Sequence, residues 1–160
     1  MARAYLGLGS NVGNSAATIR AAFASLETFL SGSRLSRLWC TKAMYVTDQA
    51  DFVNAAAMGE TTLSPRELLV TINAVEALFG RDRVRERFKG PRSLDIDILL
   101  YDDIVLREAD LVIPHAALRE RQFALEPLLD LDPSLRDPLS GEPYAAVLAS
   151  LPPQGIYLLG

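Results

Sequence analysis

Two aspartates, Asp95 and Asp97, open an apolar segment near the middle of the chain. Side chains of a β-strand alternate between its faces, so a strand here would place both carboxylates on one side, roughly 7 Å apart. Ile96, Ile98 and Leu100 would then lie on the other side. Paired carboxylates repel each other unless a cation compensates. The spacing suits one or two Mg²⁺ ions on a polyphosphate, and the alternative is a solvated strand face without chemistry.

A cluster of basic residues lies just before these aspartates. Within 12 positions it holds six of the 16 basic residues of the chain, namely Arg81, Arg83, Arg85, Arg87, Lys89 and Arg92. The planar guanidinium group can bind phosphate through two parallel hydrogen bonds. Alone, such a cluster is more often a solvated loop. Next to two carboxylates it indicates phosphoryl-transfer chemistry, which needs metal ligands and donors for developing negative charge.

The only histidine, His115, follows Pro114 and precedes Arg119 and Arg121. A lone histidine is more often structural than catalytic. The neighbouring arginines favour a phosphate contact over general-base catalysis, because no carboxylate partner lies close to His115 in sequence.

Phe52 and Asn54 would share one face of a second strand. There the ring could stack on a flat ligand and the amide could bind the ligand's edge, with core packing as the alternative. The glycine-rich run from Gly7 to Gly13 lacks the lysine of a nucleotide-binding phosphate loop. We therefore expect a tight turn that brings the backbone close to a ligand or a neighbouring strand.

The elements that position these residues can be predicted from hydrophobic periodicity and capping signals. Asn14 or Ser15 can cap a first helix that Gly32 stops, and Ser64 with Glu67 forms a capping box for a second helix that Gly80 ends. The remaining elements are expected as strands at 3–8, 34–41, 52–62, 94–101, 104–106 and 156–159, and helices at 122–129 and 143–151. This order predicts an α+β ferredoxin-like sandwich with a mainly antiparallel sheet. A parallel α/β fold would need more crossover helices.

Composition narrows the functional class. The 160 residues suit a single domain spanning 1–160, with 49% hydrophobic and 22% charged residues as in ordinary globular proteins. A net charge of −4 argues against a nucleic-acid partner, and no apolar run approaches the length of a membrane helix. The single cysteine and the lack of a signal peptide lead us to expect a cytoplasmic protein.

Taken together, the motifs resemble the 6-hydroxymethyl-7,8-dihydropterin pyrophosphokinases of folate biosynthesis over nearly the whole chain. The residues that carry the resemblance are Gly9-Ser10-Asn11, Phe52-Val53-Asn54-Ala55, Gly80-Arg81-Asp82-Arg83, the run from Gly90-Pro91-Arg92 through Leu94-Asp95-Ile96-Asp97 to Leu99, Pro114-His115 and Arg121-Gln122-Phe123. No single motif is specific, but their combination and order are.

The resemblance implies transfer of pyrophosphate from ATP to the hydroxymethyl group of the pterin, with release of AMP. Asp95 and Asp97 would bind two Mg²⁺ ions, and the catalytic residues would be Arg83, Arg92 and Asp97, with Asp97 the best available candidate for a general base. Contacts to ATP would come from Glu76, Arg83, Arg92, Ile98, His115, Arg119 and Arg121. Contacts to the pterin would come from Thr41, Met44, Phe52, Asn54, Asp95 and Phe123, with the two phenylalanines stacking on opposite faces of the ring. We expect a monomer acting on small molecules, without nucleic-acid or membrane partners.

Two other functions stay open at this point. Another two-metal enzyme, such as a nuclease or nucleotidyltransferase, is disfavoured by the acidic balance and the Phe52–Phe123 pair. A non-catalytic binding module on the same sandwich is disfavoured because Asp95, Asp97 and Arg92 are all retained.

Overall fold

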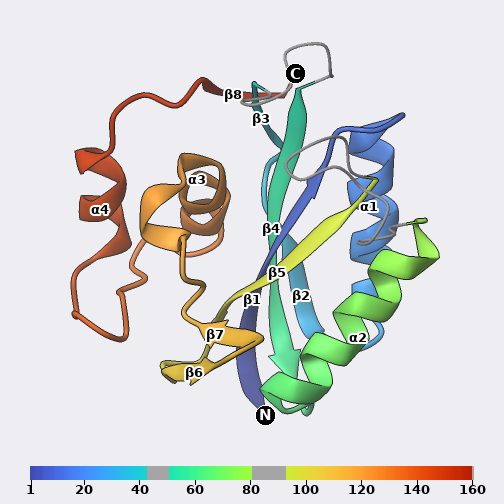
Figure 1. The fold of residues 1–160 in the computed structure, drawn as a ribbon, viewed down its shortest axis with the longest axis horizontal. Coiled ribbons are helices and arrows are strands. Elements are labelled where there is room, and N and C mark those ends of the chain that lie inside the picture. The colour runs from blue at the N-terminus through green and yellow to red at the C-terminus, as the bar shows by residue number, and fades with distance from the viewer. Residues whose placement is uncertain (43–50, 81–92, 160) are drawn as a thin grey trace.

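A six-stranded sheet forms the centre of the computed structural model, which describes residues 1–42, 51–80 and 93–159 (Figure 1). The strands follow the order β5-β1-β4-β3-β8, with β2 also paired to β4, and every pairing is antiparallel. Their bounds are β1 Ala2–Ser10, β2 Ser31–Leu35, β3 Trp39–Thr41, β4 Phe52–Thr61, β5 Asp95–Tyr101 and β8 Ile156–Leu158. With one helix after β1 and one after β4, this confirms the ferredoxin-like sandwich.

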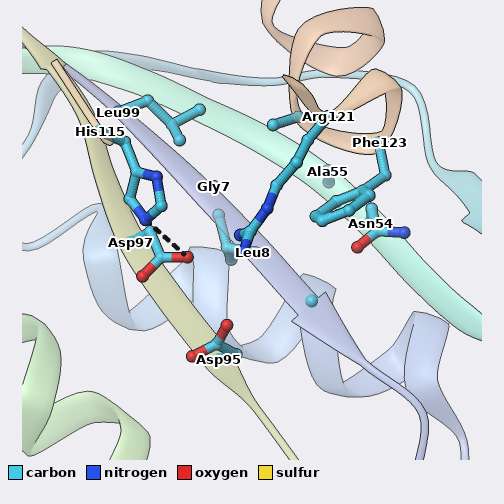
Figure 2. Close-up of a pocket in the computed structure, with 12 residues that line it drawn as sticks. Gly7, Leu8, Asn54, Ala55, Asp95, Asp97, Leu99, His115, Arg121 and Phe123 are labelled. Carbon is cyan, nitrogen blue, oxygen red and sulfur yellow. Dashed lines mark ion pairs between the residues drawn. The ribbon is translucent and has the colours of Figure 1, made fainter. Parts of the chain in front are cut away.

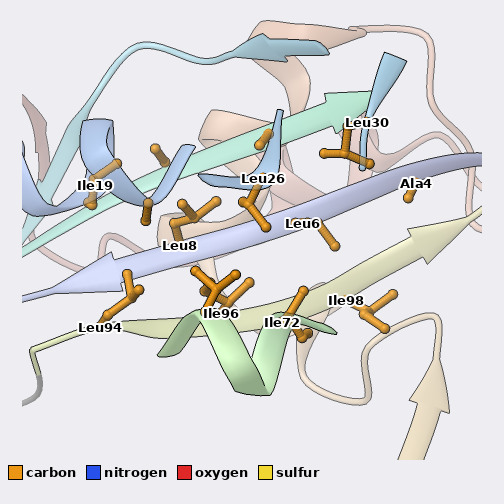
Figure 3. Packing of buried hydrophobic residues seen from close by; sticks show 14 of the residues in the cluster. Ala4, Leu6, Leu8, Ile19, Leu26, Leu30, Ile72, Leu94, Ile96 and Ile98 are labelled. Atoms are coloured by element: carbon orange, nitrogen blue, oxygen red, sulfur yellow. The ribbon is translucent and has the colours of Figure 1, made fainter. Parts of the chain in front are cut away.

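Helices α1 (Ser15–Leu26) and α2 (Pro65–Leu78) cover one face of the sheet (Figure 1). Their starts are set locally, because the Asn14 side chain accepts the Ala17 N–H and Ser64 forms the predicted capping box with Glu67. Between these helices and the sheet lies a core of aliphatic side chains, shown in Figure 3, that includes Leu6, Leu8, Ile19, Leu26, Ile72, Ile96 and Ile98.

In the described part of the chain, the opposite face of the sheet is covered only in part. Helices α3 (Gln122–Leu131) and α4 (Tyr144–Ser150) pack there, preceded by the 3₁₀ turn η1 (Leu118–Glu120) and the small hairpin of β6 (Leu106–Glu108) and β7 (Leu111–Ile113) (Figure 1). A second core joins them to the sheet through residues such as Tyr5, Met58, Leu99, Leu125 and Tyr144. The part of this face nearer the start of β5 carries the site described below.

Three sequence-based expectations for the elements were wrong. Helix α1 ends at Leu26 rather than near Gly32, because the chain turns to bury Leu30 beside Gly59, and Gly32 lies in β2 with a φ of +58°. The predicted strand at 34–41 is two strands, because at Ser36 the hydroxyl accepts the Ala56 N–H that a regular strand would pair with a carbonyl. The strand expected at 104–106 lies at Leu106–Glu108.

Candidate active site

The floor of the site is made by three neighbouring strands, β4, β1 and β5. One row across the sheet places Gly9 of β1 between Asn54 and Asp95, and the next row places Gly7 between Ala56 and Asp97. A pocket lies over these rows on the α3 side of the sheet (Figure 2). Its lining adds Leu99, His115, Arg121, Phe123 and Ala124 to the residues of the floor.

The tight turn expected within Gly7–Gly13 is found only at residues 12–14, where the chain bends and Gly13 has a φ of +68°, and is wrong for Gly7 and Gly9, which lie within β1. Their missing side chains leave the floor flat beside the aspartates, the usual role of a strand glycine where a ligand approaches the backbone. A Cβ on Gly9 would stand 3.2 Å from Oδ1 of Asn54. The close approach of the backbone expected for this glycine-rich run is therefore found at Gly7 and Gly9, but within a strand. A Gly-x-Gly pair in an alternating strand pattern is the signal that could have revealed this.

Asp95 and Asp97 share one face of β5 as predicted, and both are half-buried. The expectation that Leu100 shares a face with Ile96 and Ile98 was wrong, because Leu100 packs in the core under α3. The pairing register with β1 jumps after Ile98 and leaves Leu99 without an opposite residue. This bulge turns the next side chain to the other face, as an extra residue in one strand must.

Glu76 holds the outer edge of β5. Its side chain comes from α2, is 1% exposed and accepts the Ile96 N–H at 2.8 Å. Among the described strands, β5 pairs only with β1 and is the edge strand of the sheet. The Glu76 carboxylate therefore satisfies a backbone donor on the side of β5 that faces away from β1. Ile98 is buried in the core under α1 and α2, so contact with ATP at this residue would have to use its backbone. The ATP contacts of Glu76 and Ile98 stay predictions.

His115 meets a carboxylate that is distant in sequence. Its Nε2 lies 3.7 Å from Oδ2 of Asp97, as Figure 2 shows. The Ala117 N–H donates to Nδ1 of His115 at 3.1 Å, so the neutral ring carries its proton on Nε2, facing Asp97. Burial and then the charge of Arg121 lower the pKa of His115, against an opposing effect of Asp95. The ring is therefore neutral near pH 7.

Arg121 and Phe123 form the wall on the α3 side. The Arg121 guanidinium carbon lies 5.3 Å from the centre of the Phe123 ring, a cation–π distance. Figure 2 shows Arg121 reaching across the pocket between His115 and Phe123. The α3 side thus presents a positive charge and an aromatic face to the same space.

The predicted pterin contacts at the β3–β4 end lie together. The Asn54 amide donates to the Thr41 hydroxyl, and both side chains are buried. Thr41 is the register partner of Phe52, the first residue of β4. The structure therefore brings Thr41, Phe52 and Asn54 to one end of the β3–β4 pair, and Asn54 extends this group into the pocket.

Arg119 lies apart from the pocket lining. Its guanidinium pairs with Asp137 at 2.9 Å and Glu142 at 2.6 Å, and the Asp137 side chain is almost fully buried. Its phosphate contact stays a prediction. Met44, Arg83 and Arg92 fall outside the described residues.

Solved structures with the same fold support the topology. The chain aligns with a crystal structure of HPPK-DHPS in complex with substrates at a TM-score of 0.72 and 14% identity, over 93% of this chain and 43% of that one. The chain also aligns with the crystal structure of wild-type HPPK-DHPS of Plasmodium falciparum with SDX-DHP. The TM-score is 0.69 and the sequence identity 17%, over 93% of this chain and 43% of that one. At these identities the likeness concerns the fold alone.

Proteins found by sequence comparison have a higher sequence identity to this chain than these solved structures. A 2-amino-4-hydroxy-6-hydroxymethyldihydropteridine pyrophosphokinase of Aquifex aeolicus is 44% identical over 144 residues, covering 89% of this chain and 88% of that protein. A protein of the same name from Methylorubrum extorquens is 43% identical over 159 residues, covering 98% of each. The folic acid synthesis protein fol1 of Schizosaccharomyces pombe is 41% identical over 158 residues, 97% of this chain but only 21% of that protein.

The family comparison covers most of the structure. The family described as 7,8-dihydro-6-hydroxymethylpterin-pyrophosphokinase (HPPK) matches residues 5–133, which include every described residue that lines the pocket. Together with the relatives that match along nearly their whole length, this establishes that the chain belongs to the 7,8-dihydro-6-hydroxymethylpterin-pyrophosphokinase family.

Proposed function

We propose that this protein transfers pyrophosphate from ATP to the hydroxymethyl oxygen of 6-hydroxymethyl-7,8-dihydropterin in folate biosynthesis, releasing AMP. The observation that carries the proposal is the row Asn54–Gly9–Asp95 in a chain of this family. It sets an amide suited to a pterin edge beside a carboxylate suited to a phosphate-bound cation, with only a glycine between them. Both substrates could therefore meet on one flat floor.

The proposed reaction is an in-line displacement at the β-phosphorus of ATP. The hydroxymethyl oxygen forms a new bond to that phosphorus, and the bond from it to the oxygen shared with the α-phosphorus breaks. The shared oxygen leaves with AMP, while the hydroxyl proton is released. Because phosphoryl transfer has little covalent work for the protein, positioning and charge neutralisation supply most of the rate.

Asp97 is the candidate to receive that proton. Its Oδ2 lies 3.7 Å from Nε2 of His115, and the neutral His115 ring puts no positive charge beside the carboxylate. Arg121 supplies a permanent positive charge across the pocket for phosphate oxygens. From the resemblance, Arg83 and Arg92 would contact the transferred pyrophosphate.

The donor set fits Mg²⁺. The two half-buried carboxylates Asp95 and Asp97 supply oxygen ligands on one strand face, and no group of three or more metal-binding side chains occurs among residues 1–42, 51–80 and 93–159. Mg²⁺ usually takes one or two carboxylates and completes its shell with waters and phosphates. Bound there with ATP, the ions would neutralise phosphate charge. Asp95 and Asp97 would hold them.

The setting of the reaction is also proposed. No helix in the described part of the chain is long and apolar enough to cross a membrane. The single cysteine, Cys40, is buried in the core, and burial raises the pKa of its thiol. This agrees with a reducing compartment, so we propose a cytoplasmic monomer.

The test is the identity of the nucleotide product. Purified protein is incubated with ATP and Mg²⁺, with and without the hydroxymethyl pterin, and products are separated by chromatography. We expect one AMP for each pterin pyrophosphate, and neither product when the pterin is omitted or EDTA is added. ADP as the product would mean attack at the γ-phosphorus and would contradict the proposal. Binding of both ligands without any product would favour a non-catalytic module.

A further inference from the structure

The N-terminus of α3 is capped by a residue from the far end of the chain. Helix N-termini leave backbone donors unsatisfied, and the residue before the helix usually caps them. Here Arg121 occupies that position and makes no capping bond through its side chain. Instead, the Gln122 N–H donates to Oε1 of Gln154, 32 residues later, at 2.9 Å.

The two glutamines bind each other reciprocally. The Gln154 N–H donates to Oε1 of Gln122 at 3.0 Å, and Nε2 of Gln154 donates to the Glu120 carbonyl at 2.9 Å. Three hydrogen bonds therefore tie Gln154 to the segment 120–122. This segment contains Arg121 and leads directly to Phe123, and these two residues form the α3-side wall of the pocket.

The same tail reaches the other side of the site. After Gln154 it enters β8, which pairs with β3 and places Ile156 opposite Thr41. The Tyr157 hydroxyl donates to the Asp51 carboxylate at 2.6 Å, which raises the pKa of Tyr157 to about 12. Asp51 directly precedes Phe52. Figure 1 shows the tail running from α4 to the sheet edge beside β3.

We propose that Gln154 and Tyr157 are positioning residues that set the separation of the two aromatic side chains of the pterin site. Gln154 acts on Phe123 through Gln122, and Tyr157 acts on Phe52 through Asp51. The inference rests on the proposed function for the identity of the ligand. It adds residues that lie beyond the part of the chain matched by the family, which ends at residue 133.

The tail contributes little to the core. Tyr157 and Leu158 are 45% and 44% exposed, and the bonds of Gln154 join backbone groups rather than bury apolar surface. Its main effect therefore falls on the two segments it connects. Pterin affinity should depend on it more than ATP affinity, because the tail is tied next to both stacking rings. Of the predicted phosphate and metal contacts, Arg121 lies in the tied segment, whereas Asp95, Asp97 and His115 are held by β5 and its neighbours.

The variant Gln154→Ala removes the two bonds that the Gln154 side chain makes, to the Gln122 N–H and the Glu120 carbonyl, and keeps the backbone N–H that donates to Gln122. Binding of the pterin, in the presence of Mg²⁺ and a non-hydrolysable ATP analogue, and binding of the analogue alone are measured by calorimetry. We expect the pterin Kd to rise about 5-fold, the equivalent of one net hydrogen bond, while the Kd of the analogue stays within about 2-fold. Gln154→Glu keeps an acceptor for the Gln122 N–H and should recover part of the loss.

A double-mutant cycle tests the hydrogen bond between Tyr157 and Asp51. Tyr157→Phe and Asp51→Ala should each weaken pterin binding, and the two changes together should cost no more than the larger one. Leu159→Ala is the matched control, since Leu159 lies on the same tail, is 43% exposed and bonds to Leu38 only through its backbone. Equal losses for both ligands, or a loss equal to that of Leu159→Ala, would overturn the proposal.

Amide exchange separates this inference from the proposed function. In the free protein, Gln154→Ala should speed hydrogen exchange at the Gln122 amide without changing exchange in the centre of β1. If the wild type binds no pterin but this exchange changes as expected, the proposed function fails while the helix cap stands. If the Gln122 amide exchanges at the wild-type rate in the variant, the positioning mechanism is wrong whatever the ligand.

Discussion

The two faces of the sheet are made by the same strands but have different roles. On the α1/α2 face, β1 presents Leu6 and Leu8, which are almost fully buried. On the α3/α4 face the alternate residues of that strand are Tyr5, which packs in the second core, and then Gly7 and Gly9, which line the pocket. Alternation along a strand thus assigns stability to one face and ligand contact to part of the other.

This difference between the two faces predicts whether a substitution lowers stability or activity. The α1/α2 face is covered along its length by two capped helices, so its side chains are insulated from any ligand (Figure 3). Among residues 1–42, 51–80 and 93–159, the opposite face is covered where α3 and α4 pack, and the part beside them gathers two carboxylates, a histidine and an arginine. Loss of stability and loss of activity should therefore separate by face, although the residues involved are neighbours in sequence.

The strongest test of this separation is Asp97→Asn. The substitution removes a proposed metal ligand and its charge while keeping the shape of the side chain, so turnover should be nearly abolished and the thermal midpoint should stay near wild type. Steady-state AMP formation and thermal unfolding measure the two quantities. Turnover at the wild-type rate at ordinary Mg²⁺ concentrations would remove Asp97 from the active site.

Leu6→Ala should have the opposite signature. Leu6 is fully buried on the α1/α2 face, so the cavity should lower the free energy of unfolding by about 2–5 kcal/mol. Activity per folded molecule should be unchanged below the unfolding transition. Leu78→Ala serves as control, because Leu78 is 78% exposed on α2. A large fall in kcat at full folding would show that the two faces are coupled.

Phe123→Ala tests the aromatic wall. Removal of one stacked ring should weaken pterin binding by about 1–3 kcal/mol, the scale of a lost base–aromatic contact. ATP binding should hardly change, because the Arg121 charge remains. Calorimetry with each ligand provides the comparison, and equal losses for both would argue against a dedicated stacking role.

The smallest expected effect concerns the floor. Gly9→Ala would place a methyl group 3.2 Å from Oδ1 of Asn54, and pterin binding should weaken by about 1 kcal/mol, the low end of the cost of overpacking. Gly7→Ala is the matched variant, since its methyl group would meet only the side chain of Leu99 at 3.4 Å. Pterin titrations of both variants should show the larger change for Gly9→Ala. The reverse order would mean that the ligand lies over Gly7.

Local rules explain how much could be predicted without the structure. The capping box of Ser64 and Glu67 and the shared face of Asp95 and Asp97 depend on spacings of two to three residues, and both are confirmed. The ferredoxin-like fold could also be predicted, because the order of strands and helices along the chain is compatible with few topologies.

Tertiary structure decided what depends on segments far apart in the chain. The bulge that turns Leu100 over arises from the pairing of β5 with β1, and the approach of His115 to Asp97 requires the chain after β7 to return to β5. The cap of α3 by Gln154 joins residues 32 positions apart. Hydrophobic alternation and capping signals reach only a few residues, whereas these contacts appear only once the packed layers bring distant backbone groups within hydrogen-bonding distance.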